Sequence, residues 1–491
     1  MASKGYPMGE TKPASLPCSF NASVHVEGRG DRLSSEGGVL AIRELDERLG
    51  LTHWLAEHLH DPRDPKLITH PLVELLRART YLMAQGQRDQ DDADRLRNDP
   101  ACRLAVSQRR GLSPLEATDG ENLPDGLASQ PTQSRLIESL STKENLETLN
   151  RGLFESARRD LLAHRGRRFQ NVTLDIDSLP VEVHGEQAGS AFNGHYGVRC
   201  YHPIVAMLSE TAHWLRAALR PGNVYTSVGA AAFLLPLIDE VEQKIACVAR
   251  VRGDAGFPDE KLLVPLENRK IGYAFRLKTN AVLEKLARPF LHRPPGRPPR
   301  ESREWFHELE YRAESWIKAR RIVLVVLERP GELFVDHFFL LTNWSVEQIG
   351  GKDLLEFYRV RGTMESHLGE LQSVLAPALS CTSRPKSQIG GKPPAKKTSP
   401  RDGERANEAT FLLYALAYNL ANSARRVMNS EAPGKDGGGW SLRRLRDVVL
   451  RVAVRLTVSA RRATIVMNEA SARVWNQLWA GIARLNPVLQ T

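Results

Sequence analysis

Residues 357–372 contain several chemically active side chains at helical spacing. At about 100° per residue, one arc of roughly 60° holds the side chains of Tyr358, Arg361, Glu365 and Gln372. A phenol, a guanidinium and a carboxylate in such a row suit a metal-binding acid with a phosphate-binding cation beside it. An exposed helix with a surface ion pair has the same pattern, and this segment alone does not separate the two.

Two more acids lie on a segment that alternates like a strand, residues 169–180. Apolar side chains face one way in this segment, whereas Asp175 and Asp177 face the other. Two carboxylates on one face are costly if they are buried without partners, and a bound cation would remove that cost. The alternative is a strand end at the surface, where both acids contact water.

A fourth acid, Asp254, follows a predicted strand at residues 245–252 and is flanked by glycines. The C-terminal end of a strand is where an α/β sheet exposes a functional carboxylate. By contrast, the acidic cluster at residues 89–94 lacks the glycine and the terminal glutamate of a calcium loop. We interpret that cluster as a solvated helix start.

The elements that must position these acids follow in a recognisable order. Residues 203–208 and 214–220 are predicted to form a hairpin, and residues 229–242 a helix. A β-rich stretch then separates Asp254 from the helix of Glu365. Within this stretch, the basic, proline-rich loop at residues 292–300 is either a DNA-contacting tip or a solvated connector.

The composition sets general limits on the size, the partner and the compartment of the protein. The chain has 491 residues, enough for two to four domains, and a formal charge of +10, which favours a polyanionic partner such as nucleic acid. Its five cysteines are far apart, which predicts a reducing compartment and excludes a zinc knuckle. No signal core or membrane-spanning stretch is evident, so we expect a soluble, cytoplasmic protein.

The order of these elements resembles that of the ribonuclease-H-like core of DDE transposases. This order is a strand with Asp, two strands, a helix, a strand with Asp, an insertion and a helix with Glu. Tyr358, Arg361 and Glu365 meet most of the Tyr-x2-Arg-x3-Glu-x6-Lys signature of one bacterial insertion-sequence superfamily. Its other blocks are similar to residues 174–178 with His184-Gly185, residues 252–257 and residues 416–420. The resemblance covers about residues 20–480.

This resemblance implies roles for the acids. Asp177, Asp254 and Glu365 would form the catalytic triad and bind two Mg²⁺ ions, which Mn²⁺ can replace. Asp175 shares the face of Asp177, so it is a further candidate ligand, although the serine after Asp177 favours Asp177. The residues expected to contact DNA are Tyr358, Arg361, Gln372, Arg297 and Arg300.

The implied organisation is an α/β protein with a ribonuclease-H-like catalytic core, a β-rich insertion, a helical N-terminal DNA-binding region and a helical C-terminal region. The N-terminal region includes a capped helix near residues 129–138, whose first turn either faces water or reads DNA. The expected divisions are a disordered tail (1–20), the N-terminal region (21–165), the core (166–257 and 346–428), the insertion (258–345), a flexible basic loop (383–402) and an Arg-rich helical tail (429–491).

The implied function is a transposase that binds the terminal inverted repeats of an insertion sequence and catalyses metal-dependent strand cleavage and transfer. Its partners would be double-stranded element and target DNA, with a homodimer in the synaptic complex at the bacterial nucleoid. Gln372 departs from the signature, because it brings no charge where lysine is expected. The alternatives are a catalytically inactive, transposase-derived DNA-binding protein and a different two-metal phosphoesterase.

Overall fold

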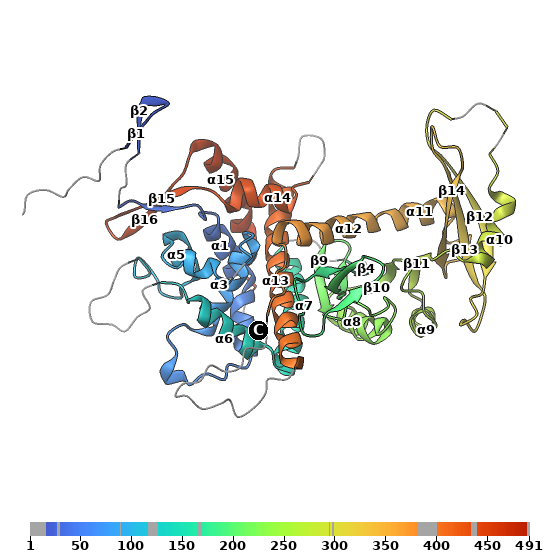
Figure 1. Ribbon diagram of the computed structural model, residues 1–491, viewed down its shortest axis with the longest axis horizontal. Helices are drawn as coiled ribbons and strands as arrows, with labels where there is room; N and C mark the ends of the chain where they lie inside the picture. Colours follow the sequence, from blue (N-terminus) through green and yellow to red (C-terminus); the bar gives the residue numbers. More distant parts are fainter. Residues whose placement is uncertain are drawn as a thin grey trace, which may run out of the picture.

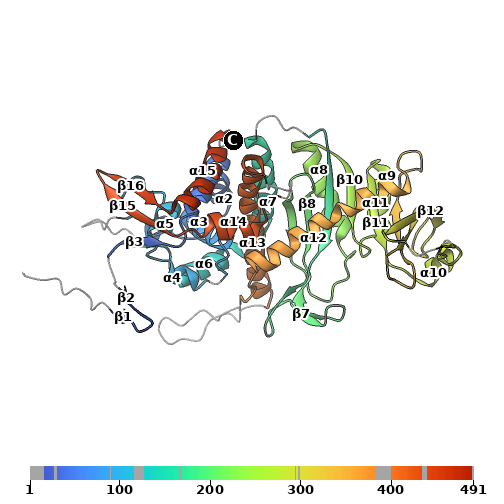
Figure 2. The ribbon, with the colours of Figure 1, turned by 90° about the horizontal axis from the view of Figure 1, so that it is seen from above.

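The computed structural model describes nine segments of the chain, namely residues 16–26, 30–88, 90–115, 126–164, 169–293, 295–296, 299–381, 400–433 and 439–488. Figures 1 and 2 show an elongated molecule with a helical body at one end and a strand-rich region at the other. One sheet runs from beside the helical body into the strand-rich region (Figure 1). None of the described helices is both long and apolar enough to span a membrane.

The central sheet has eight strands in the order β12-β13-β14-β11-β10-β4-β8-β9. The five strands from β11 to the edge strand β9 are β4 (Asn171–Ser178), β8 (Ile204–Leu208), β9 (His213–Ala218), β10 (Cys247–Gly253) and β11 (Gly272–Leu277). β4 pairs in parallel with β10 and antiparallel with β8, and β10 pairs in parallel with β11. The expected α/β class is confirmed, with a mixed central sheet.

The remaining three strands extend this sheet from the side of β11. They are β12 (Arg303–Tyr311), β13 (Arg320–Glu328) and β14 (Asp336–Thr342), and all three pairings in this part are antiparallel. The short helices α9 (Glu260–Asn268) and α10 (Ala281–Ala287) and a 3-10 turn (Arg288–Phe290) precede them. The stretch between Asp254 and the helix of Glu365 is therefore β-rich, and it includes β11.

The two faces of the sheet have different partners. On one face, Val172, Leu174 and Ile176 of β4 belong to a core shared with α8 (Ala230–Lys244) and α9. On the other face, α11 (Gly351–Arg359) packs its Leu354 and Leu355 against β13 and β14. Alternation along β4 thus sends its apolar side chains to one helix layer and its acids to the opposite face.

The helical body joins the two ends of the chain around one long helix, α13 (Pro400–Glu431), which contacts α1, α3, α6, α7 and α15. Figure 1 shows this helix between the body and the sheet. The other helices and helical turns of the body are α1 (Val39–Leu49), α2 (Leu51–His58), a 3-10 turn (Pro65–Leu67), α3 (Leu72–Ala84), α4 (Asp92–Arg95), α5 (Pro100–Val106), α6 (Gln130–Leu140), α7 (Lys143–Ala163), α14 (Leu442–Leu445), a π-helical turn (Arg446–Leu450) and α15 (Glu469–Arg484).

Strands also occur where the sequence analysis expected a disordered tail or helices. The first strands, β1 (Leu16–Cys18) and β2 (Asn21–Val26), pair with each other, so the segment expected to be disordered already contains part of a hairpin. In the tail, β15 (Val454–Ser459) and β16 (Arg462–Val466) form a hairpin that pairs with β3 (Arg32–Ser34). The expectation of a wholly helical tail was wrong, because residues 454–466 alternate in polarity and the Arg-rich composition obscured that period. The expected flexible loop, residues 383–402, lies almost wholly outside the described residues.

Candidate active site

The register of the two central parallel strands brings two of the predicted acids together. Arg252 and Gly253 of β10 pair with Asp175 and Ile176 of β4, so Asp254 comes next to Asp177 at the carboxyl ends of both strands. Neighbouring strands lie about 4.8 Å apart, which places the two carboxylates within reach of a shared ligand. Asp254 accepts a hydrogen bond at Oδ1 from the backbone N–H of Gly256 (2.9 Å), which fixes its carboxylate at the turn after the strand.

Asp177 occupies an unfavourable position for a negative charge. Its side chain is 6% exposed. Burial raises the pKa of Asp177 to about 7, and the charges of Asp254 and Glu365 act in the same direction, against the opposing effect of Arg361. A buried carboxylate near two others is stabilised by an added cation, whether this cation is a side chain or a metal ion.

Asp175 lies on the same face but already has a full set of partners. Arg252 donates from Nε to Asp175 Oδ1 (2.7 Å) and from Nη2 to Oδ2 (2.8 Å), and both side chains are 2% exposed. The same guanidinium donates from Nη1 to the carbonyl oxygen of Phe357 (2.7 Å) and from Nη2 to Ser209 Oγ. This bidentate pair ties β4 to β10 and to the end of α11, so Asp175 acts as a structural acid in this arrangement.

The helix predicted around residues 357–372 is an almost continuous rod, visible across Figure 2. It consists of α11, α12 (Arg361–Glu370) and a π-helical turn (Leu371–Leu375). Val360, between α11 and α12, keeps helical angles (φ −58°, ψ −21°), so the rod bends little there. Tyr358 is the next-to-last residue of α11 and Arg361 is the first residue of α12. Burial raises the pKa of the Tyr358 phenol.

Arg361 links the rod to the sheet. It donates from Nη2 to Asp177 Oδ2 (2.6 Å) and from Nη1 to Glu365 Oε1, one helical turn further along. The Arg361 side chain is 8% exposed, whereas that of Glu365 is 60% exposed. The guanidinium therefore bridges two of the three predicted acids, and the negative charge of Asp177 raises the pKa of Arg361 against the effect of burial.

The other predicted contact residues are distributed differently. Gln372 is exposed and donates from Nε2 to the carbonyl oxygen of Pro180 (2.7 Å), so it joins the rod to the loop after β4. Arg300 is exposed in the loop before β12, and Arg297 lies outside the described residues. The first turn of α6, which either faces water or reads DNA, was expected to present Gln133 and Arg135. Gln133 is 1% exposed and faces the core, whereas Arg135 is exposed.

Sequence reasoning missed a group of side chains that surround Asp177. Arg220 donates from Nη2 to Ser178 Oγ (2.8 Å) and from Nε to the carbonyl oxygen of His202 (3.0 Å). Tyr196 lies on the turn between β6 (Ala191–Asn193) and β7 (Val198–Tyr201), which with β5 (Val181–Glu182) form a small sheet. After burial, the charges of Asp177 and Asp254 are the main causes that raise the pKa of Tyr196. No local pattern indicated these residues, since Arg220 follows Ser178 by 42 positions in the sequence.

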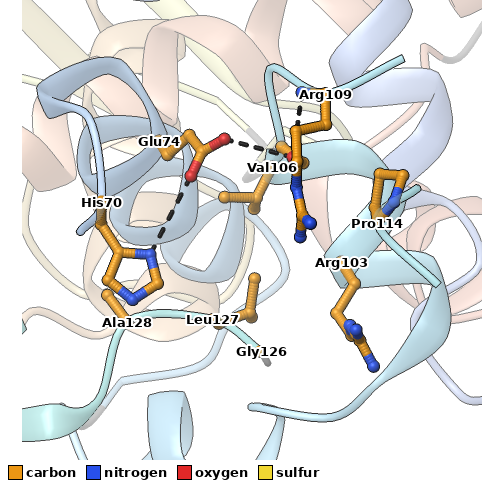
Figure 3. Close-up of a pocket in the computed structure, with 10 residues that line it drawn as sticks. His70, Glu74, Arg103, Val106, Arg109, Pro114, Gly126, Leu127 and Ala128 are labelled. Atoms are coloured by element: carbon orange, nitrogen blue, oxygen red, sulfur yellow. Dashed lines mark hydrogen bonds and ion pairs between the residues drawn. The ribbon is translucent and has the colours of Figure 1, made fainter. Parts of the chain in front are cut away.

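A small pocket in the helical body is distinct from this cluster (Figure 3). Its one carboxylate, Glu74, accepts hydrogen bonds from the backbone N–H of Gln108 (2.7 Å) and from Ser107 Oγ (3.2 Å). Although burial opposes its charge, these bonds and His70 lower the pKa of Glu74. The carboxylate is already satisfied by the protein, and we assign no chemistry to this pocket.

The acids as they stand do not form a ready metal cage. Among the residues that the structure describes, no three His, Cys, Asp or Glu side chains are arranged to hold a metal ion. The donor set of Asp177, Asp254 and Glu365 consists only of carboxylate oxygens, which suits a hard divalent cation. In this arrangement Arg361 supplies the positive charge between Asp177 and Glu365.

Residues 16–389 match a family model described as transposase DDE domain, group 1. The chain belongs to this family. Divalent metal ions are in general use among DDE transposases, and the match spans both aspartates and Glu365. One solved structure, a synaptic complex of piggyBac transposase with hairpin DNA, aligns with 84% of this chain and 79% of that chain at 12% identity and a TM-score of 0.39. No curated protein matches the chain.

Proposed function

We propose that the protein is an active transposase, which binds the terminal inverted repeats of an insertion sequence and cleaves and joins DNA strands with divalent metal ions. Asp177, Asp254 and Glu365 are its catalytic acids in this proposal. The single observation that carries it is the register of β4 and β10, which sets Asp177 beside Asp254 and faces both toward the Arg361–Glu365 turn. We further propose that β4, β8, β9, β10 and β11 form a ribonuclease-H-like core.

The residues fit the expected metal, because they are all oxygen donors and because the buried Asp177 lacks enough positive charge to keep its pKa low. When bound, two Mg²⁺ ions would activate the attacking oxygen and stabilise the leaving one. Asp177 and Asp254 would hold both ions from the sheet, and Glu365 would complete the set from α12. Asp175 is excluded from our assignment, since Arg252 occupies both of its oxygens.

The side chains of this chain also have roles that do not depend on the ions. Arg361 neutralises Asp177 in the free protein, and its planar guanidinium suits a phosphate oxygen once Asp177 has another partner. Tyr358 lies on the preceding turn, from which its phenol can donate to a neighbouring phosphate. Gln372 keeps the loop after β4 next to the rod, and its amide can bind a phosphate without adding charge.

The substrate of this site is double-stranded DNA, both the ends of the element and the target. The formal charge of +10 favours such a polyanion. Because two element ends have to be held together before they are joined, we propose a homodimer in the synaptic complex. Arg300, in the loop before β12, and Arg297, which lies outside the described residues, are proposed DNA contacts.

A second possibility is a transposase-derived DNA-binding protein that has lost catalysis. Gln372 in place of the expected lysine, together with the internal pairing of Glu365 by Arg361, is the observation that favours it. This form would keep the fold and the basic surfaces. It differs from the active form in only one respect, which is strand cleavage.

A cleavage assay on the ends of the element separates these two functions. The test compares the wild-type protein with Asp177→Asn, Asp254→Asn and Glu365→Gln in Mg²⁺ or Mn²⁺, after each variant has been shown to keep its thermal stability and its DNA binding. We expect cleavage by the wild type and a loss of at least 100-fold in each variant, the order of effect that a lost catalytic group produces. A wild-type protein that binds the ends but never cleaves them supports the second function instead.

A further inference from the structure

The hairpin β15–β16, which we call the hairpin arm (residues 454–466), has one face on which polar and basic side chains predominate. Three cross-strand pairs share this face, and all six residues are exposed: Arg455 with Val466, Thr457 with Thr464, and Ser459 with Arg462. Hydroxyl and guanidinium groups therefore follow one another along a two-stranded ribbon. Both kinds of group donate hydrogen bonds to phosphates and to base edges.

The opposite face anchors the arm. Leu456 is buried, and Val458 and Ile465 pack against the core of the helical body. β15 also pairs with β3 from the start of the chain. Figures 1 and 2 both place the arm at the end of the molecule opposite to the three strands β12, β13 and β14. The arm is thus held in place by the helical body and by β3, and its other face is exposed to solvent.

The turn of the arm has a backbone that its residues do not favour. Ala460 (φ 48°) and Arg461 (φ 62°) both adopt left-handed angles at the two central positions between β15 and β16. Such turns prefer asparagine and glycine, since side chains with a Cβ are strained there. An arginine at the second position costs stability, so its presence at the exposed tip favours a role outside folding.

The hairpin arm carries positive charges and no negative ones. No aspartate or glutamate occurs from Val448 to Asn468, a stretch that contains four arginines. Within the described segments, no ion pair or side-chain hydrogen bond involves Arg455, Arg461 or Arg462. These guanidinium groups remain available for an external anion, and a two-stranded ribbon has the width of a DNA groove.

We propose that the hairpin arm binds double-stranded DNA, with Arg455, Arg461 and Arg462 contacting phosphates and the Thr and Ser hydroxyls facing the groove. The inference rests on the proposed function, since it assumes that the element's DNA passes along this protein. The arm and the acids occupy different parts of the molecule, so the arm would grip duplex that is not being cut. It would add affinity and position the end of the element for the acids.

The test measures the binding of the full-length protein to a duplex that carries the terminal repeat, by fluorescence anisotropy without divalent metal and at several salt concentrations. The variant is Arg461→Ala/Arg462→Ala. Each lost phosphate contact lowers the salt slope by about 0.9 and weakens binding roughly fivefold at about 0.15 M salt. We therefore expect a 5- to 30-fold loss for the double variant and a shallower slope.

The matched control is Arg473→Ala/Arg484→Ala on α15, which removes the same charge from exposed arginines that are already paired with Glu469 and Glu431. This control should keep the wild-type slope. A second variant, Arg461→Gly, separates folding from binding, because glycine accepts the left-handed angle. Its melting temperature should equal or exceed that of the wild type, while its DNA affinity should fall.

Two outcomes would overturn the proposal. If the arm variants bind the duplex with the affinity and salt slope of the wild type, the arm has no part in DNA binding, and the transposase function is unaffected. If the wild-type protein itself binds no duplex, both the arm proposal and the transposase function fail. An equal loss in the control and in Arg461→Ala/Arg462→Ala would reduce the effect to net charge and would likewise contradict a specific role for the arm.

Discussion

Replacing Asp175 and Asp177 separately by asparagine should give opposite phenotypes, although the two acids lie two residues apart on the same face of β4. Asp175→Asn removes the charge partner of Arg252, whose guanidinium is 2% exposed and holds β4, β10 and the end of α11 together. Leaving one member of a buried ion pair without its partner costs about 3–5 kcal/mol. At a few degrees per kcal/mol, the melting temperature should drop by about 5 °C or more.

Asp177→Asn should have little effect on stability. Burial already disfavours the charge of Asp177, so removing this charge relieves a cost, and Arg361 keeps Glu365 as a partner. We expect the free energy of unfolding to stay within about 1 kcal/mol of the wild-type value, because the lost ion pair and the relieved burial of charge offset each other. Cleavage of DNA, in contrast, should be lost.

Thermal unfolding followed by circular dichroism, together with the cleavage assay, checks both halves of this prediction. The result that refutes it is a reversal, in which Asp175→Asn is stable but inactive whereas Asp177→Asn is unstable and still cleaves DNA. Such a reversal would make Asp175 the catalytic acid and Asp177 the structural one. The comparison therefore tests the choice between the two acids that the sequence left open.

Further variants test individual parts of the structure. His213 is fully buried, and burial lowers its pKa from 6.5 to about 3, so the unfolded chain binds the extra proton and stability is lost as pH falls below about 6.5. Between pH 7 and pH 5, we expect the free energy of unfolding of His213→Asn to fall by about 2 kcal/mol less than that of the wild type, as measured by denaturant unfolding. Gln372→Lys should tighten DNA binding and steepen its salt slope by about 0.9, since it adds a cation to an exposed position. Gly253→Ala should cost about 1–3 kcal/mol and slow cleavage, because a Cβ at residue 253 would lie 2.8 Å from the Phe275 ring.

Local patterns in the sequence predicted the elements near the site better than their partners. Alternation over residues 169–180 identified β4 and the common face of Asp175 and Asp177. Helical spacing placed Arg361 and Glu365 one turn apart, where they now form an ion pair. These features depend on side chains two to four residues apart, and the alternation of polar and apolar residues at these spacings can be read directly from the sequence.

Long-range partners could not be predicted in the same way. Nothing in the sequence indicated that Arg252 would pair with Asp175, 77 positions earlier, because the register of two parallel strands is set by packing across the whole sheet. The burial of Gln133 could not be predicted either, because the sequence indicated its helix but not the elements that pack against it. The hairpin arm was missed for another reason, as arginines at irregular intervals suggested a helix where the apolar residues alternate.

The claim that Asp177 and Asp254 hold catalytic metal ions is tested most directly by changing the metal preference of the site. Cysteine in place of either aspartate offers a soft sulfur ligand, which Mg²⁺ binds poorly and Mn²⁺ accepts better. The measurement is cleavage of the element's ends by Asp177→Cys and Asp254→Cys in each metal, with Asp175→Cys as the control. We predict that both site variants are inactive in Mg²⁺ and regain cleavage in Mn²⁺, whereas the control shows no such dependence. Cleavage in Mg²⁺ that equals that of the wild type in either site variant would contradict the claim.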